Sequence, residues 1–298
     1  MSVSWPNLPA LELFVAVVEE GSVGAGARKV GMAQPNASRT LAQLESRLKT
    51  PLLERSPRGT VPTARGVLYA DQAREVLASA RRFVDWLQAG HEGGILELRI
   101  GASMTIAETL LPAWLAELKR RLPQVRAEVR VLNSARVLDE VQAGTLHLGF
   151  VETPHVPVRL NAQVVQEDEL VVVVDPDHVW ATRAGGVGAR ELARTPLVVR
   201  EHGSGTREAL RELLGGYPPV EPAQTLGSNA AVRVAVASGA GPAALSHLAL
   251  RDQLASGELL RVPLQHRAPK RPLTAVWSGP RVLTGPAAEL VAVAQTGH

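Results

Sequence analysis

Residues 11–66 read LELFVAVVEEGSVGAGARKVGMAQPNASRTLAQLESRLKTPLLERSPRGTVPTARG, and this stretch decides how the chain begins to fold. Its first apolar residues are spaced as on one face of a helix, and Gly21-Ser22 then marks a turn and an N-cap. A second helix is expected to end at Gly31. A third begins near Gln34-Pro35, where proline is tolerated because a first-turn N–H has no partner within the helix.

The third helix combines an apolar stripe (Ala37, Leu41, Leu44, Leu48) with a polar, cationic face. Polar and cationic side chains of these types hydrogen-bond base edges and phosphates, and the second helix of such a pair lies in the major groove of DNA. The residues expected to contact DNA from this helix are Gln34, Pro35, Asn36, Ser38, Arg39, Thr40, Gln43 and Arg47.

Two short strands, residues 52–55 and 60–61, flank a turn with well-placed proline and glycine, which predicts a winged helix. Arg55 and Arg58 join the expected DNA contacts. Arg58 lies at the wing tip, where it would reach a backbone phosphate or the minor groove; an ordinary exposed turn arginine is the alternative.

The charge distribution supports a DNA-binding N-terminus. Residues 1–66 carry eight Lys/Arg against five Asp/Glu, whereas the rest of the chain carries 24 of each, so the net charge of +3 is N-terminal. A merely solvated basic face is the alternative. The length of 298 residues and 45% apolar content allow two domains, and the absence of cysteine suits a reducing compartment. Neither a signal peptide nor a membrane span is indicated, so we expect a cytoplasmic protein.

Taken together, the motifs resemble those of the LysR-type transcriptional regulators. The matching positions are Leu11, Phe14, Val17, Gly21-Ser22, Gln34-Pro35, Ser38, Leu41, Leu44-Glu45, Leu52-Leu53, Arg55, Pro62-Thr63 and Gly66. Three positions depart from the pattern or from good helix formation. Ala33 stands where the family has a serine cap, and Gly24 and Gly26 lie inside the second helix. Each costs about 1 kcal/mol by ordinary capping and propensity values, so a looser module is expected.

The resemblance implies a winged helix-turn-helix domain over residues 1–62, a linker helix over residues 63–90, and homodimers or homotetramers. A 4-3-4-3-4 spacing on the linker suggests a coiled-coil seam, and the alternative is a helix packed on its own domain. The expected dimerisation residues are Tyr69, Ala73, Val76, Ala80, Phe83 and Leu87.

From Leu96 onward, strand-like runs alternate with helical ones, which predicts parallel α/β units. The resemblance implies a periplasmic-binding-protein-like effector domain over residues 95–298. Its lobe I would comprise residues 95–165 and 269–298, and its lobe II residues 166–268. One helix is expected near residues 105–121, and a strand at residues 169–174.

Ligands of such sheets bind beyond the carboxyl ends of the strands. Polar residues at those ends give the expected effector site: Ser103, Thr105, Asn133, Ser134, Glu152, Arg200, Gly203, Ser204, Gly205, Thr206 and Asn229. A helix N-terminus with nearby arginines favours an anion, although these residues could simply cap the helix and form the turn. The Gly-Ser-Gly-Thr-Arg string also resembles a LysR-type branch that senses sulfur anions or phosphorylated metabolites, which implies a small anion or carboxylate as the effector.

No catalytic constellation with suitable spacing is present, and neither a metal nor a cofactor is expected. The sequence therefore predicts a ligand-responsive DNA-binding regulator with two partners, double-stranded DNA and a small effector. The alternative is a metabolite-binding or solute-binding module without transcriptional output. The basic N-terminal helix pair discriminates between the two, because such a module has no use for it.

Overall fold

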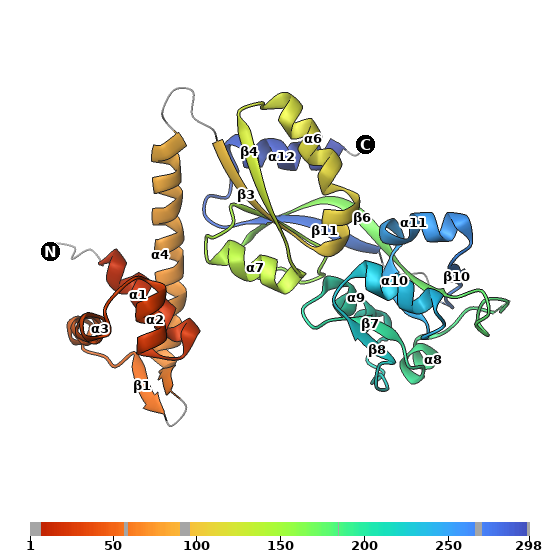
Figure 1. Cartoon of the computed structure of the whole chain (residues 1–298), viewed down its shortest axis with the longest axis horizontal. Coiled ribbons are helices and arrows are strands. Elements are labelled where there is room, and N and C mark those ends of the chain that lie inside the picture. The colour runs from red at the N-terminus through yellow and green to blue at the C-terminus, as the bar shows by residue number, and fades with distance from the viewer. Residues whose placement is uncertain (1–6, 57–58, 90–95, 184, 266–269, 297–298) are drawn as a thin grey trace. The chain divides into compact units, whose positions relative to one another are not determined.

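The computed structural model describes residues 7–56, 59–89, 96–183, 185–265 and 270–296. The chain divides near residue 90 into two compact units (Figure 1). The N-terminal unit is the expected winged helix-turn-helix followed by a long helix. Its elements are α1 (Leu8–Glu20), α2 (Val23–Lys29), α3 (Gln34–Leu48), the antiparallel pair β1 (Leu53–Ser56) and β2 (Gly59–Pro62), and α4 (Ala64–Ala89).

Side-chain caps set the beginnings of α2 and α4. Ser22 Oγ accepts a hydrogen bond of 3.1 Å from the backbone N–H of Ala25, and Thr63 Oγ1 accepts one of 2.9 Å from that of Gly66. Ala33 precedes α3 without any side-chain capping bond, because its methyl group has no acceptor. The recognition helix therefore begins without the cap that the other two helices have.

The two glycines of α2 have different roles. A Cβ at Gly26 would lie 2.7 Å from the backbone nitrogen of Val17, so α1 and α2 can approach this closely only where α2 has no side chain. A Cβ at Gly24 would meet the Gln34 side chain at 3.6 Å, which is an ordinary contact. The expectation that both glycines loosen the module is therefore wrong for Gly26, where packing requires glycine.

The core of this unit forms between the three short helices and α4. Phe14 and Ala37 are fully buried, and the ring of Tyr69 on α4 packs edge-on against Phe14 with 5.5 Å between centroids. Burial raises the pKa of the Tyr69 hydroxyl. The predicted apolar stripe of α3 ends at the half-buried Leu44, because Leu48 is 40% exposed.

The C-terminal unit is built on a mixed sheet whose nine described strands follow the order β4-β3-β5-β11-β6-β9-β7-β8, with β10 paired to β6. β3, β4 and β5 are parallel, whereas β11 is antiparallel to both β5 and β6. The strands are β3 (Leu96–Ala102), β4 (Val125–Val131), β5 (Leu148–Val151), β6 (Asn161–Val174), β7 (Val198–Arg200), β8 (Gln224–Leu226), β9 (Ala243–Ser246), β10 (Leu260–Val262) and β11 (Lys270–Trp277).

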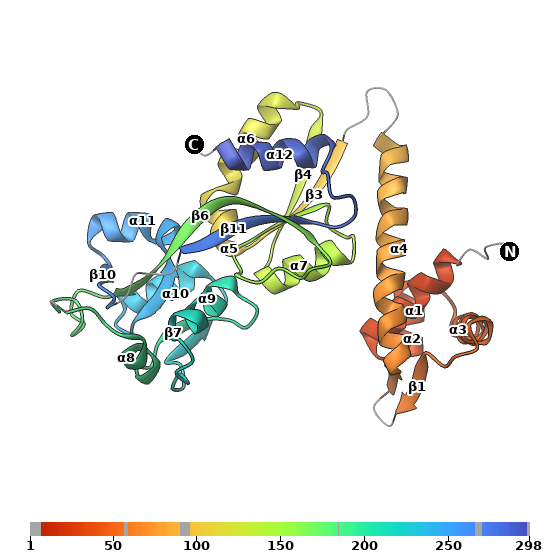
Figure 2. The ribbon, with the colours of Figure 1, turned by 180° about the vertical axis from the view of Figure 1, so that it is seen from behind.

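Two long strands, β6 and β11, join the two lobes of this sheet (Figure 2). The first part of β6 pairs with β11, and its last residues pair with β9 and β10 of lobe II. Helices cover both faces of each lobe: α5 (Met104–Thr109), α6 (Leu111–Arg121), α7 (Ser134–Gln142) and α12 (Gly285–Thr296) in lobe I; α8 (Ala189–Arg194), α9 (Gly205–Leu213), α10 (Asn229–Ala237) and α11 (His247–Ser256) in lobe II.

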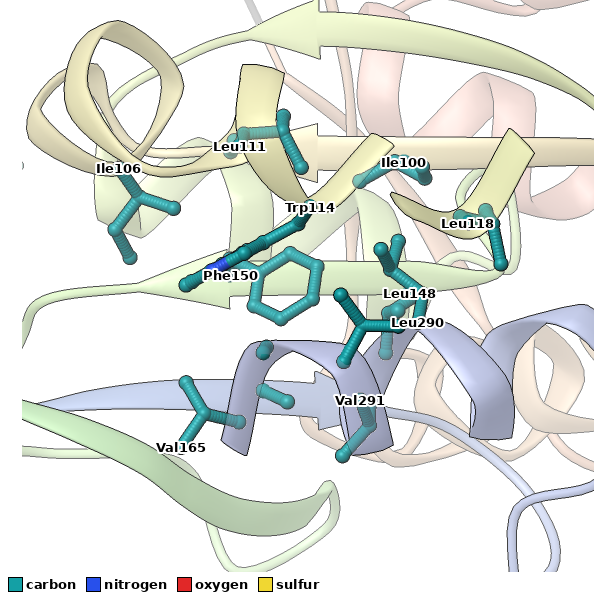
Figure 3. Close-up of a cluster of buried hydrophobic side chains, with 14 of the residues drawn as sticks. Ile100, Ile106, Leu111, Trp114, Leu118, Leu148, Phe150, Val165, Leu290 and Val291 are labelled. Carbon is teal, nitrogen blue, oxygen red and sulfur yellow. The ribbon is translucent and has the colours of Figure 1, made fainter. Parts of the chain in front are cut away.

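Each face of the sheet has its own core. In lobe I, Trp114 of α6 and Leu290 of α12 pack around Phe150 on one face (Figure 3), and Val137 and Val141 of α7 lie on the other. In lobe II, α8 and α9 cover one face, and α10 and α11 cover the other. The alternating strand and helix pattern of the sequence is therefore confirmed as an α/β fold.

Two local expectations were wrong, and one strand was missed. The single helix near residues 105–121 is two helices, because Pro112 has no N–H to donate and its ring clashes with the carbonyl four residues earlier. The strand expected at residues 169–174 begins at Asn161, where its polar residues pair with β11 instead of forming a loop. The short β10 was not expected at all.

The glycine pair of α2 gives a matched test of the packing argument. We expect Gly24→Ala to raise the free energy of unfolding by up to about 1 kcal/mol, because alanine favours the helix and fits the space. We expect Gly26→Ala to lower it by about 1–3 kcal/mol, because the methyl group overlaps the backbone of α1. Urea unfolding of both variants measures the difference, and equal effects would contradict the assigned role of Gly26.

Candidate functional site

The polar face of α3 is exposed and carries the residues expected to contact DNA. Gln34, Pro35, Asn36, Ser38, Arg39, Gln43 and Arg47 are exposed, and Thr40 is half-buried. Lys29 of α2 is engaged by Glu19 and Glu20 at 3.0 and 2.9 Å, and these bonds raise the pKa of its ammonium group. On α3 itself, the cationic side chains are those of Arg39 and Arg47.

The wing is tied to the recognition helix by Glu45 of α3. One carboxylate oxygen, Oε1, accepts hydrogen bonds from the backbone N–H groups of Leu52 and Leu53 at 2.7 and 3.0 Å. The wing is also tied to the turn after α1, because the N–H of Thr60 donates to the carbonyl of Gly21 at 2.8 Å. Arg55 lies on β1, and Arg58 lies outside the described residues.

The predicted seam of α4 divides between two surfaces. Ala73 is buried with Leu11, Val15 and Leu77, and the half-buried Tyr69 packs on Phe14, so both contact α1 of their own domain. Ala80 is half-buried, Val76 and Phe83 are exposed, and the side chain of Leu87 lies outside the described set. Together with Leu68, the exposed pair forms an apolar stripe that adjoins Tyr69 and Ala80 on the helix surface. The spacing alone could not separate this stripe from the face packed on α1.

In the C-terminal unit, the expected effector residues converge between the lobes from two similar segments. Ser103 and Thr105 begin α5 at the end of β3, and Ser204 and Thr206 begin α9 after β7. Both segments therefore place a Ser-x-Thr sequence over the first turn of a helix, and all four side chains are buried. The Oγ atoms of Ser103 and Ser204 have no hydrogen-bond partner among the described residues.

Lobe II contacts lobe I directly beside these segments. The N–H of Ala135 donates to the carbonyl of Gly203 at 3.1 Å, and the Asn133 amide donates to the carbonyl of His202 at 3.2 Å. A Cβ at Gly205 would lie 2.7 Å from the Glu152 carbonyl oxygen, so this approach requires glycine. Ser134 Oγ lies 3.4 Å from the backbone N–H of Glu152, from which it accepts a hydrogen bond.

Arg271 of β11 gathers charges from both lobes around one buried guanidinium group. Its Nε and Nη2 donate to Asp168 Oδ2 at 2.9 and 2.8 Å, and Nη2 also donates to Glu152 Oε2 at 3.0 Å. Its Nη1 donates to Thr206 Oγ1 at 3.0 Å. One guanidinium group therefore contacts two buried carboxyl groups, although its single positive charge can balance only one, and it also holds the first turn of α9.

Arg200 and Asn229 form a second polar group that crosses between the lobes. The Arg200 guanidinium donates to both carboxylate oxygens of Glu201 and, through Nη1, to Asn229 Oδ1 at 2.6 Å. Asn229 Nδ2 donates to Thr105 Oγ1 at 3.3 Å and to Glu108 Oε2 at 3.2 Å. Arg200 was expected to bind the anionic effector directly, but its positive charge is already balanced by the carboxylate of Glu201.

The sequence reasoning missed Asp168, Arg271 and Glu108. Asp168 and Arg271 face each other in the antiparallel register of β6 and β11. Each interrupts or borders an apolar strand, and a charged residue at such a position is buried only when it is paired. This was the signal that could have identified them. Glu108 lies on the short α5 and gave no such signal.

Among the described residues, no helix is both long and apolar enough to cross a membrane. In the same part of the chain, no three metal-ligating side chains of the His, Cys, Asp and Glu types cluster as a metal site would.

The comparisons agree with this architecture. Residues 8–67 match the family "Bacterial regulatory helix-turn-helix protein, lysR family", and residues 91–297 match "LysR substrate binding domain". An uncharacterized HTH-type transcriptional regulator of Mycobacterium tuberculosis is 41% identical over 291 residues, covering 94% of this chain and 93% of the relative.

Two solved structures share the fold. A full-length OxyR variant of Pseudomonas aeruginosa has a TM-score of 0.65 at 22% identity and covers 98% of this chain and 95% of its own. The regulatory domain of Synechocystis CcmR, in complex with 2-PG, has a TM-score of 0.60 at 26% identity and covers 67% of this chain and 96% of its own.

The DNA-reading module and the two-lobed domain define a ligand-responsive transcriptional regulator, not an enzyme. The chain belongs to the LysR family of regulators. The alternative of a binding module without transcriptional output therefore receives no support.

The anchor between α3 and the wing can be tested at Glu45. We expect Glu45→Ala to lower the free energy of unfolding of the N-terminal domain by about 1–3 kcal/mol, because two backbone N–H groups lose their acceptor. Urea unfolding followed by circular dichroism measures this loss. Glu54→Ala, at an exposed residue of β1, is the control, and an equally small effect at both positions would exclude the anchor.

Proposed function

We propose that the effector of this regulator is a small anion or carboxylate bound between the lobes by the two Ser-x-Thr segments, together with Ser134. The observation that carries the proposal is the pair of buried, unpartnered hydroxyls of Ser103 and Ser204. A buried polar group without a partner costs about 1–3 kcal/mol, so two of them at one cleft indicate a missing hydrogen-bonding group.

The two threonines support an acceptor ligand. Thr206 Oγ1 accepts a hydrogen bond from Arg271, and Thr105 Oγ1 accepts one from Asn229. Each hydroxyl therefore keeps its own proton for donation, and a serine or threonine hydroxyl has only one proton to give. The first turn of α9 adds backbone N–H groups and the positive end of a helix dipole. These groups suit an anionic oxygen, and the ligand bound by the CcmR domain shows that a related domain takes a small molecule.

DNA binding and the effector are coupled through the population of lobe arrangements. A ligand that binds one arrangement more tightly shifts the population toward it, which changes how paired winged helices hold two half-sites and the bend between them. Homodimers or homotetramers would use the exposed stripe of Leu68, Val76 and Phe83 on α4. A cytoplasmic location fits this function, because a transcriptional regulator acts where the DNA is.

Ligand binding is tested by thermal unfolding with sodium sulfate, sulfite, phosphate and organic acids. We expect at least one of them to raise the melting temperature with increasing concentration, because a ligand of the native state stabilises it by mass action. Ser103→Ala with Ser204→Ala should abolish the effect. Ser238→Ala, at an exposed serine of lobe II, should leave it intact. If none of these anions stabilises the wild-type protein, the proposed effector class is wrong.

Arg39 is the first residue to test in the DNA interface. We expect Arg39→Ala to weaken binding to DNA from the region upstream of the protein's own gene by about 1–3 kcal/mol if it reads a base. If Arg39 instead contacts a phosphate, its loss should reduce the slope of the logarithm of the DNA affinity against the logarithm of the salt concentration by about one. Fluorescence anisotropy at several salt concentrations measures both. Arg120→Ala in α6 is the control, and unchanged DNA binding in Arg39→Ala would refute the assignment.

A further inference from the structure

Asn229 is a buried residue at the start of α10, and its side-chain amide lies between the lobes. Its Oδ1 accepts a hydrogen bond from Arg200 of lobe II, and its Nδ2 donates to Thr105 and Glu108 of lobe I. The side chain has no exposed surface, and both N–H groups and the carbonyl oxygen have protein partners. The amide therefore has no N–H group left for a ligand.

The orientation of this amide is fixed by Arg200. An arginine guanidinium can only donate hydrogen bonds, so the asparagine oxygen must face it and the NH2 group must face lobe I. Arg200 is itself held by Glu201 at 2.8 and 3.0 Å. A continuous chain of hydrogen bonds thus runs from Glu201 through Arg200 and Asn229 to lobe I.

This orientation determines what Thr105 can do. Because Asn229 donates to Thr105 Oγ1, the threonine proton cannot point back at the amide and is left for another acceptor. Ser103, two residues earlier, has a buried and unpartnered hydroxyl. Both hydroxyls lie in the first turn region of α5, where the proposed effector would bind.

We propose that Asn229 is a positioning residue that latches lobe II onto lobe I and directs the Thr105 proton into the cleft, so that effector binding is coupled to lobe closure. The part that concerns the effector rests on the proposed function above. The latch itself does not, because its bonds to Thr105 and Glu108 join the lobes within the protein. Arg233 of α10 lies 3.9 Å from the same Glu108 carboxylate and reinforces the latch.

The variant Asn229→Asp has the same shape and reverses the hydrogen-bonding role. A carboxylate there still accepts from Arg200, but it cannot donate to Thr105 and repels Glu108. Thr105 would then donate to the new carboxylate instead of to the cleft. Asn161→Asp is the matched control, because the Asn161 amide donates to backbone carbonyls outside the cleft, at Gly279 among others.

The latch is measured first, in the full-length protein without added anion. The chain has no cysteine, so spin labels attach only at introduced positions, Arg120→Cys in lobe I and Arg211→Cys in lobe II. Electron spin resonance then gives the distance distribution between the lobes. We expect Asn229→Asp to lengthen or broaden it and Asn161→Asp to leave it unchanged. Glu108→Ala removes an acceptor of the Asn229 amide on lobe I and should also lengthen or broaden the distance distribution. It keeps the test available if Asn229→Asp does not fold.

Positioning of Thr105 is measured by calorimetric titration with sodium sulfate, or with the anion that stabilises the wild-type protein most. We expect Asn229→Asp to weaken binding about tenfold or more, as for a lost hydrogen bond to a charged group. To separate Thr105 from the latch, both variants are compared in a Glu108→Ala background, which already lacks the bond to Glu108. If Asn229 acts on the effector through Thr105, Thr105→Val with Asn229→Asp should there bind no more weakly than Thr105→Val. If Asn229→Asp only disturbed the structure, the fold losses of anion affinity caused by the two substitutions would multiply in the double variant.

Unchanged lobe distances in both Asn229→Asp and Glu108→Ala would overturn the latch, and multiplied losses in the double variant would overturn the positioning of Thr105. Failure of the proposed function gives a different result, because the wild-type protein would then bind no anion while the distance measurement would still report the latch.

Discussion

A single buried cation, the guanidinium group of Arg271, holds the effector domain together at the point where its two lobes meet. It lies on one of the two strands shared by the lobes, pairs with Asp168 on the other, and contacts Glu152 of lobe I and Thr206 of lobe II. Removing one partner of a buried ion pair generally costs about 3–5 kcal/mol, because the remaining charge is left uncompensated. The placement of the α9 segment with Ser204 and Thr206 against β6, β11 and Glu152 therefore depends on this group.

The same interaction sets the electrostatic character of the region where the lobes meet. Arg271 and Arg200 are the buried arginines of the described chain, and both have carboxylate partners. An anion in this cleft would be held by hydroxyl groups and the N-terminus of α9, with no uncommitted buried cation. Neutral donors fixed by a rigid surrounding discriminate by geometry, because each must lie within hydrogen-bonding distance of a particular ligand oxygen. The similar Ser-x-Thr turns supply such donors from opposite sides.

In the DNA-reading module, tertiary contacts act against some of the low helix propensity that its composition implies. Gly26 lowers helix propensity, yet it lets α1 and α2 pack with their backbones in close approach, and Glu45 satisfies two N–H groups at the start of the wing. Ala33 leaves α3 without a side-chain cap. Low helix propensity thus destabilises these helices while tertiary packing stabilises them. A count of helix-forming and helix-breaking residues does not reveal the packing contribution.

The sequence by itself determined the α/β alternation, the helix-turn-helix, the polar face of α3 that is expected to contact DNA, and the two helix starts that carry Ser-x-Thr. These depend on periodicity and capping, which are properties of neighbours along the chain. Only the tertiary structure decided which polar groups meet. Asp168 and Arg271 are 103 residues apart, and Thr105 and Asn229 are 124 apart, so no local pattern could pair them. The tertiary structure also decided that Ala73 of the expected seam faces its own domain. The spacing of apolar residues on α4 would suit packing against α1 and packing against a second chain equally well.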